Sequence, residues 1–138
     1  MRAEEYLEQH GKIADMIERN KTEYKAIMNA LDLVGIDYSK DRVQSPINDI
    51  FAETIARAES RLKAIKRDLK RLLEIQEEIC ETIKKVGDER LELLLTLHYI
   101  ALLPWEKVAE EMDIARSTVY LWRIEALKKV DEILKGWR

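Results

Sequence analysis

Side chains suited to contacting bases and phosphates concentrate in one stretch near the C-terminus. The residues that we expect to contact DNA are Lys107, Arg116, Ser117, Thr118, Tyr120, Leu121 and Arg123. An arginine such as Arg116 can bond guanine bidentately or clamp a phosphate, and serine and threonine hydroxyls bond either phosphates or bases. Tyr120 and Leu121 leave two interpretations open, which are apolar contact with thymine methyl groups and packing against a neighbouring helix.

The sequence gives little indication of catalysis or metal binding. The chain has no Gly-rich phosphate loop and no nucleophile beside a histidine. Its single cysteine is Cys80 and its two histidines are His10 and His98, which give neither an internal disulfide nor a zinc-ligand spacing. We therefore expect no enzyme activity, no catalytic residue, no bound metal and no cofactor.

A short helix and a longer one are predicted to position the DNA-contacting side chains. The first, WEKVAEEM, starts at Pro104, and only residues 113–115 separate it from the second, which opens at Arg116. A short helix, a turn of three or four residues and a longer helix form the helix-turn-helix pattern, whose second helix lies in the major groove. The side chains expected in the core of this motif are Val108, Ala109, Met112, Val119, Trp122, Ala126 and Leu127.

The same stretch carries a family resemblance. LTLHYIALLPWEKVAEEMDIARSTVYLWRIEALKKV resembles the fourth domain of sigma factors, and more closely the phage-encoded ArpU and RinA type regulators of late transcription. DRVQSPINDIFAETIARAE also resembles the region that precedes the long helix in those phage proteins. The resemblance is most specific over residues 43–59 and 91–130.

The resemblance implies an all-helical transcriptional regulator of a phage or prophage. It makes WEKVAEEM the supporting helix and Arg116 the basic residue that opens the recognition helix. Val119 and Tyr120 match the Val-Tyr pair of the phage proteins, and Ala126 and Leu127 match an Ala-Leu pair common to both groups.

The chain also departs from those families. Ala115 stands where a serine or threonine caps the recognition helix, which weakens the cap by about 1 kcal/mol. His98 takes the place of an arginine, and Trp122 and Arg123 replace a Leu-His pair. Sigma factors carry charged and amide residues in place of the Ser, Thr, Tyr and Leu found between residues 117 and 121. A promoter element like theirs is therefore not the expected target.

Composition favours an all-α fold. Of 138 residues, 37% are charged and 46% hydrophobic, with only 4 Gly and 2 Pro, which is the bias of long helices. We expect a long, coiled-coil-like antiparallel helical hairpin over residues 1–86, with a linker at 35–45, and a sigma-like helix-turn-helix domain over 87–138.

Two heptad patterns predict the hairpin. Apolar residues spaced three and four apart mark one side of a helix, and Ser45 followed by Pro46 predicts the start of the second. The first stripe is Tyr6, His10, Ile13, Ile17, Asn20, Tyr24, Ile27, Leu31 and Val34. The second is Phe51, Ile55, Ala58, Leu62, Ile65, Leu69, Leu72, Gln76, Ile79, Ile83 and Val86. This register places His10 beside Gln76, where the two side chains either reach solvent or pair with each other.

Two helices alone bury little apolar surface, so further helices are expected to pack against the hairpin. The second helix has further apolar residues at Leu73, Ile75 and Cys80. We expect a homo-oligomer, with a dimer favoured, while packing against the chain's own C-terminal helices is the alternative.

Charge is unevenly distributed. The net charge is -3, yet residues 57–71 carry 7 basic and 2 acidic side chains. Three interpretations of this basic block stay open, which are ion pairs with the acidic first helix or a partner subunit, contact with the DNA backbone, and contact with RNA polymerase.

Together these patterns predict a sequence-specific regulator of transcription that binds double-stranded DNA, such as a phage late-gene activator. Host RNA polymerase is a further candidate partner. The sequence has no membrane-spanning stretch and no signal-peptide pattern, so the cytoplasm of a bacterial host is the expected location and no membrane contact is expected. Two alternatives stay open, which are a DNA-packaging subunit of the small-terminase type and a polymerase-binding adaptor that reads no bases.

Overall fold

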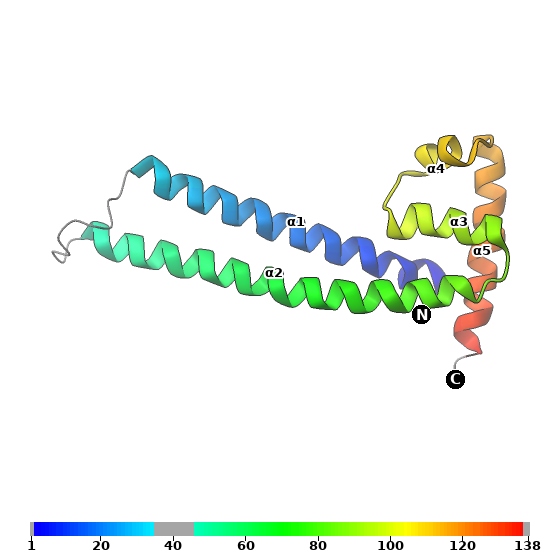
Figure 1. Ribbon diagram of the computed structural model, residues 1–138, viewed down its shortest axis with the longest axis horizontal. Coiled ribbons are helices and arrows are strands. Elements are labelled where there is room, and N and C mark those ends of the chain that lie inside the picture. Colours follow the sequence, from blue (N-terminus) through cyan, green and yellow to red (C-terminus); the bar gives the residue numbers. More distant parts are fainter. Residues whose placement is uncertain (1, 35–45, 137–138) are drawn as a thin grey trace. The chain divides into compact units, whose positions relative to one another are not determined.

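The computed structural model describes residues 2–34 and 46–136, and these residues form helices and no strand (Figure 1). The helices are α1 (Ala3–Val34), α2 (Pro46–Lys84), α3 (Glu89–Leu95), the π-helical turn η1 (Thr96–Ile100), α4 (Trp105–Met112) and α5 (Arg116–Lys135). The all-α prediction is confirmed. The predicted linker 35–45, with the proposed cap at Ser45, lies outside the described residues. None of the described helices combines the length and the apolar character needed to cross a membrane.

The chain divides into two compact units, which do not follow the predicted boundary at residue 86. Unit 1 contains residues up to 13 and from 72 onward, and unit 2 contains residues 14–71. The boundary shifts because the first turns of α1 and the last turns of α2 share a core with the C-terminal helices. Leu7 and Ile79, for example, have no exposed surface and belong to the same cluster as Leu91.

The core of unit 1 draws on every helix of that unit. Its largest fully buried apolar side chains are Leu7, Ile79, Leu91, Leu94, Leu95, Val108, Val119 and Val130. Ile75 packs partly buried against this cluster, so the chain's own C-terminal helices cover part of the apolar surface predicted on α2. Leu73, in contrast, keeps 62% of its surface exposed.

Polar contacts fix the register of α1 and α2 inside unit 1. The hydroxyls of Tyr6 and Thr82 lie 2.9 Å apart, and Nε2 of His10 lies 3.2 Å from Oε1 of Gln76, which accepts the hydrogen bond. Residue numbers rise along α1 as they fall along α2, so these segments are antiparallel. His10 is only 5% exposed. Of the two interpretations left open for His10 and Gln76, the structure confirms the pairing, and the one in which both reach solvent is wrong.

The start of α1 is held by α5. The backbone N–H of Ala3, the first residue of α1, donates to Oδ1 of Asp131 at 2.8 Å. The first N–H groups of a helix have no partner within it, and a carboxylate is well suited to this end of the helix dipole. Asp131 therefore caps α1 from a different helix.

Unit 2 contains the remaining parts of α1 and α2, which pair through Glu23 and Arg61 at 2.6 Å. Ile17, Leu31 and Ala58 are buried there. Leu62 and Leu69 remain 37% and 44% exposed, whereas the polar Asp68 is buried and keeps only 5% of its surface exposed. The predicted stripe on α2 is therefore not buried as a whole, because a pair of helices has only a narrow seam.

The connection from α2 to α4 starts with a turn. Gly87 has a positive φ of 75°, and the side chain of Asp88 caps α3 by accepting from the N–H of Arg90 at 3.1 Å. α3 then passes into η1, and regular helical structure ends at Ile100, before α4 begins at Trp105.

Candidate nucleic-acid interface

α4 and α5 are joined by Asp113, Ile114 and Ala115, the three residues predicted to separate them. Asp113 ends α4 in the left-handed conformation, with φ 54° and ψ 49°, which aspartate tolerates better than most residues. The N–H of Ile114 then bonds the carbonyl of Ala109 at 3.0 Å. This turn redirects the chain into α5 within three residues.

The seven side chains predicted for the core of this motif all lie in or against the core of unit 1. Val108, Ala109, Val119 and Ala126 are buried, with exposed fractions of 5% or less. The other three, Met112, Trp122 and Leu127, are partly buried and pack against them. Their burial fixes which side of α5 points away from the core.

That outward side of α5 carries three large apolar side chains. We define the outer face of α5 by its exposed residues at helical spacing, which are Ser117, Tyr120, Leu121, Ile124 and Lys128. Tyr120, Leu121 and Ile124 are 52%, 67% and 65% exposed. No helix among the described residues covers Tyr120 or Leu121, so packing against a neighbouring helix does not account for them within this chain.

Ile124 was missed as a candidate from the sequence, although its spacing could have revealed it. It lies four residues after Tyr120 and three after Leu121, and residues at these spacings share one side of a helix. An apolar residue at that position extends the apolar surface of the outer face by one turn.

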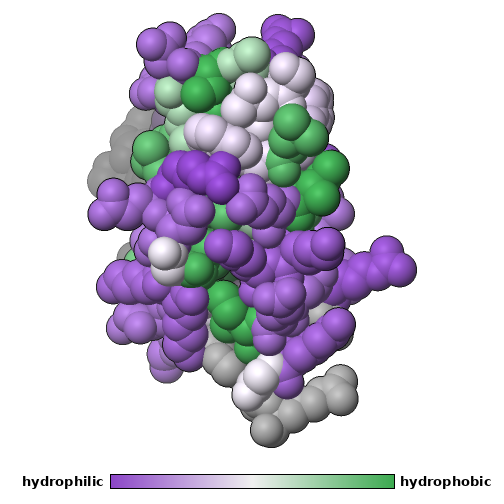
Figure 2. All heavy atoms as spheres, turned by 90° about the vertical axis from the view of Figure 1, so that its right-hand side faces the viewer, coloured by the Kyte–Doolittle hydropathy of each residue, from purple (hydrophilic) through white to green (hydrophobic). Residues whose placement is uncertain are grey.

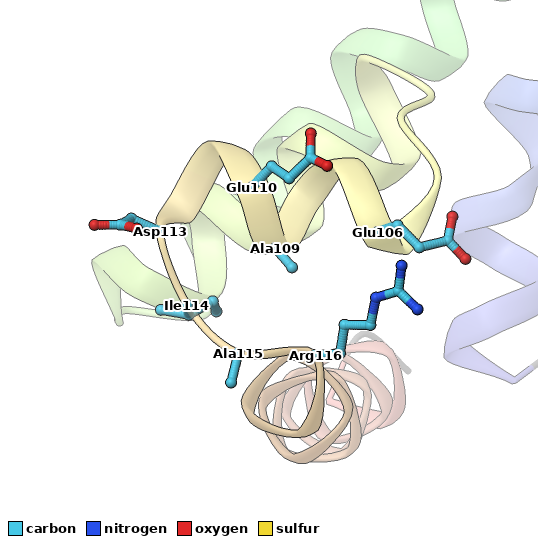
Figure 3. Close-up of a pocket in the computed structure, with 7 residues that line it drawn as sticks. All are labelled: Glu106, Ala109, Glu110, Asp113, Ile114, Ala115 and Arg116. Carbon is cyan, nitrogen blue, oxygen red and sulfur yellow. The ribbon is translucent and has the colours of Figure 1, made fainter.

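Arg116 opens α5 beside an acidic hollow. The hollow, of about 480 Å³, is lined by the carboxylates of Glu106, Glu110 and Asp113 as well as by Arg116. In Figure 3 the guanidinium of Arg116 points toward the end of the hollow where Glu106 lies. Because carboxylates repel phosphates, the side of α5 that faces α4 is electrostatically unsuited to a DNA backbone.

Arg123 does not lie on the outer face, contrary to the sequence-based expectation. Its Nη2 donates to Oε1 of Glu4 at 2.7 Å, and its guanidinium lies 5.4 Å from the ring centroid of Trp105. It is half-buried because its position on α5 turns it toward α1 and α4. Arg123 therefore holds α1 to α5 in this structure.

Two other residues predicted to contact DNA, Thr118 and Lys107, also lie outside the outer face of α5. Thr118 is half-buried on α5. Lys107 is exposed on α4, where its ammonium lies 3.2 Å from Oε2 of Glu110. The structure thus brings Ser117, Tyr120 and Leu121 together on one face, and separates them from Lys107 and Arg123.

An aromatic cluster positions the start of α4. The rings of His98 and Trp105 stack with centroids 3.7 Å apart, and Tyr99 meets Trp105 edge-on at 6.0 Å. Nδ1 of His98 lies 2.7 Å from the carbonyl oxygen of Leu103, to which it donates. Burial lowers the pKa of His98, although the bond to Leu103 opposes this shift. Burial also raises the pKa of Tyr99 to about 12, so its hydroxyl keeps its proton.

Arg90 anchors α5 to the start of α3. Its Nη2 donates to both carboxylate oxygens of Glu125 at 2.9 and 3.0 Å. The same guanidinium lies 4.8 Å from the ring centroid of Trp122, close enough for a cation–π contact. Glu125, the first acidic residue of α5 after Arg116, is therefore already paired with a cation.

The basic block of residues 57–71 lies on α2. Arg61 pairs with Glu23 of α1, and Arg67 lies 3.4 Å from Asp68, so part of the block is engaged in ion pairs. Lys63, Lys66 and Lys70 are exposed. Within the described ranges no group of three or more His, Cys, Asp or Glu side chains is arranged to hold a metal ion.

These features define a small all-helical protein whose C-terminal helix exposes three large apolar side chains in a stretch, residues 116–124, that has no acidic residue. The chain belongs to the family DUF1492, described as a protein of unknown function, which matches residues 36–131. No curated protein matches the chain. No solved structure matches it either.

Proposed function

We propose that this protein is a sequence-specific regulator of transcription that binds double-stranded DNA, with α4 and α5 as a helix-turn-helix and α5 as its recognition helix. The observation that carries the proposal is the outer face of α5, which remains exposed although the opposite side of the helix is buried in the core. Residues 116–124 include no acidic side chain, and the helix opens with Arg116. A helix with this charge pattern suits the major groove.

The electrostatics of the neighbouring groups support a defined direction of approach. Glu106, Glu110 and Asp113 make the α4 side acidic, whereas Ser117 and Lys128 lie on the outer face. DNA would therefore meet α5 from its outer face. Arg116, at the positive N-terminal end of the helix, would turn from the hollow that it lines to contact a phosphate or a guanine.

The family supports a phage role. DUF1492 is a phage-associated family, and the motif resembles that of phage late-transcription regulators. We therefore infer a regulator encoded by a phage or prophage, with activation of late genes as its role. Residues 1–86 would form a helical hairpin that joins two copies, so that two recognition helices read repeated half-sites.

Selection of bound sequences from a random DNA pool, followed by measurement of the salt dependence of binding, tests the function. We expect a defined motif and a steep loss of affinity with salt, because phosphate contacts release counterions. Failure to enrich any sequence would contradict the proposal, and co-purification with RNA polymerase in that case would favour the adaptor.

The substitution Arg116→Ala sharpens this test. Binding to the selected motif should weaken by about 1–3 kcal/mol if Arg116 bonds a guanine, and preference at one position should relax. A uniform loss over all sequences would instead mark a phosphate contact. Arg19→Ala is the matched control, because Arg19 is an exposed arginine of α1 that lies in unit 2 and outside the basic block. Equal effects of the two substitutions would contradict the role of α5.

A further inference from the structure

Tyr120, Leu121 and Ile124 form an apolar patch on a helix that otherwise follows the usual division into a buried and a polar side. Each of them is more than half exposed. Their spacing of one, three and four residues places them next to one another on the helix surface. In Figure 2, which faces the side of unit 1 where α5 lies, hydrophobic surface gathers in the upper part, at the level of the N-terminal half of α5 in Figure 1.

The groups that border this patch indicate what can occupy it. Arg116 precedes it and Lys128 follows it on the same helix, and no acidic residue lies between residues 116 and 124. Glu125, the next acidic residue, is bonded to Arg90 at 2.9 Å. The basic groups at both ends of the patch favour an anionic occupant that also presents apolar groups, and the carboxylates that line the hollow beside Arg116 would confine it to the outer face.

A second copy of this chain fits the patch poorly. If two α5 helices packed antiparallel through Leu121 and Ile124, Arg116 of one copy would approach Lys128 of the other, because both lie about six residues from the centre at residue 122. Like charges brought together in this way oppose association. Duplex DNA has the opposite charge, and the thymine methyl is the apolar group that its base edges present in the major groove.

We propose that Leu121 and Ile124, with Tyr120 beside them, read the methyl groups of two neighbouring thymines. This inference rests on the proposed function and names the bases that the same face recognises. Leu121 and Ile124 are separated by about 4.5 Å along the helix axis, which is three residues at about 1.5 Å each. That distance is close to the spacing of about 3.4 Å between successive bases of one strand. One leucine and one isoleucine can therefore meet methyl groups on adjacent base pairs.

Replacing thymine by deoxyuridine, which removes only the methyl group, tests this inference on the sequence selected from the random pool. Each thymine of the motif is replaced in turn and the Kd is measured by fluorescence anisotropy. We expect a loss of about fourfold at each of two adjacent positions, the effect of withdrawing one methyl group from a buried contact. Other thymines should tolerate the replacement.

Protein variants assign each methyl to a side chain. In Leu121→Ala the difference between thymine and deoxyuridine should vanish at one of the two positions, and in Ile124→Ala at the other. Both residues are exposed, so these variants should fold normally. Leu93→Ala is the matched control, because Leu93 is a 48% exposed leucine on α3, and it should keep both differences.

The outcomes separate this inference from the function on which it rests. If a motif is selected but deoxyuridine is tolerated at every position, the inference is wrong while DNA recognition stands. If Leu121→Ala and Ile124→Ala alter the sedimentation of the protein and leave DNA affinity unchanged, the patch is a protein interface and the inference is wrong. If no sequence is enriched, the proposed function fails and the inference fails with it.

Discussion

At the scale of single residues, the pair formed by His10 and Gln76 is a polar contact set in an apolar seam. His10 is buried, its Nε2 is bonded to Gln76, and its Nδ1 has no hydrogen-bond partner among the described residues. A buried polar pair of this kind contributes little net stability but penalises any other register. It therefore fixes how the first turns of α1 lie along α2.

The substitution His10→Leu should destabilise the protein by about 1–3 kcal/mol, because it leaves the half-buried amide of Gln76 without its partner. The double variant His10→Leu/Gln76→Leu should regain most of that loss, since it removes both polar groups. Urea unfolding followed by circular dichroism measures both. A double variant that is less stable than the single one would show that the pair is a net source of stability.

His98 should make stability depend on pH. Burial lowers the pKa of His98 in the folded protein below its ordinary value of 6.5. The imidazole of His98 therefore takes up a proton more readily in the unfolded chain. Above about pH 6.5 the neutral imidazole contributes to the free energy of unfolding, and this contribution is lost as the pH falls through the folded pKa.

Comparison with His98→Asn isolates this effect, because an asparagine amide can still donate to the carbonyl of Leu103. Thermal unfolding between about pH 7.5 and about pH 5 should show a smaller loss of stability in the variant than in the wild type. Parallel curves for the two proteins would rule out His98 as a source of the pH dependence.

At the scale of the helices, α5 begins without a side-chain cap. Ala115 occupies the N-cap position in an extended conformation, with φ -70° and ψ 151°, and makes no capping hydrogen bond. The helix is held by its buried side and by contacts from other elements, such as the bond between Asp131 and Ala3. Packing therefore substitutes for the local cap.

Two substitutions at Ala115 should separate helix stability from DNA binding. Ala115→Ser and Ala115→Asp should each stabilise the protein by about 1 kcal/mol, because either side chain can accept from a free N–H of the first turn. Ser should leave DNA affinity near the wild-type value, whereas Asp should lower it by placing a carboxylate beside the phosphates. Thermal unfolding and DNA titration measure the two effects, and equal DNA affinities would indicate that this end of α5 is remote from the backbone.

At the scale of the whole molecule, unit 2 leaves apolar surface on α2 that α1 does not cover. Leu62 and Leu69 are seven residues apart on one side of this helix and remain 37% and 44% exposed. Heptad-spaced leucines on a helix surface are typical of contacts between helices of different subunits. The proposed dimer would bury them.

The double variant Leu62→Glu/Leu69→Glu should be monomeric, whereas the wild type should sediment as a dimer at micromolar concentration. Carboxylates at both positions would be buried without partners in the interface, which opposes association. Leu93→Glu, on α3 in unit 1, is the control and should remain dimeric. Sedimentation equilibrium distinguishes these cases, and a monomeric wild type would contradict the proposed oligomer.

Local patterns in the sequence set the helices and much of their register. The three-and-four spacing predicted the stripe of α1 and the register that places His10 beside Gln76, and the residues between the last two helices predicted the turn between α4 and α5. These features depend on the period of apolar residues along one helix, which is a local property.

The packing of the helices against one another settles which parts of each stripe are buried and which polar groups are already bonded. It moved the unit boundary into α1 and α2, bound Arg123 to Glu4, and added Ile124 to the outer face of α5. The physical reason is that exposure and ion pairing depend on neighbours far away in the chain. A helical pattern shows that residues share a side, but the packing of other helices determines whether that side meets the core or the solvent.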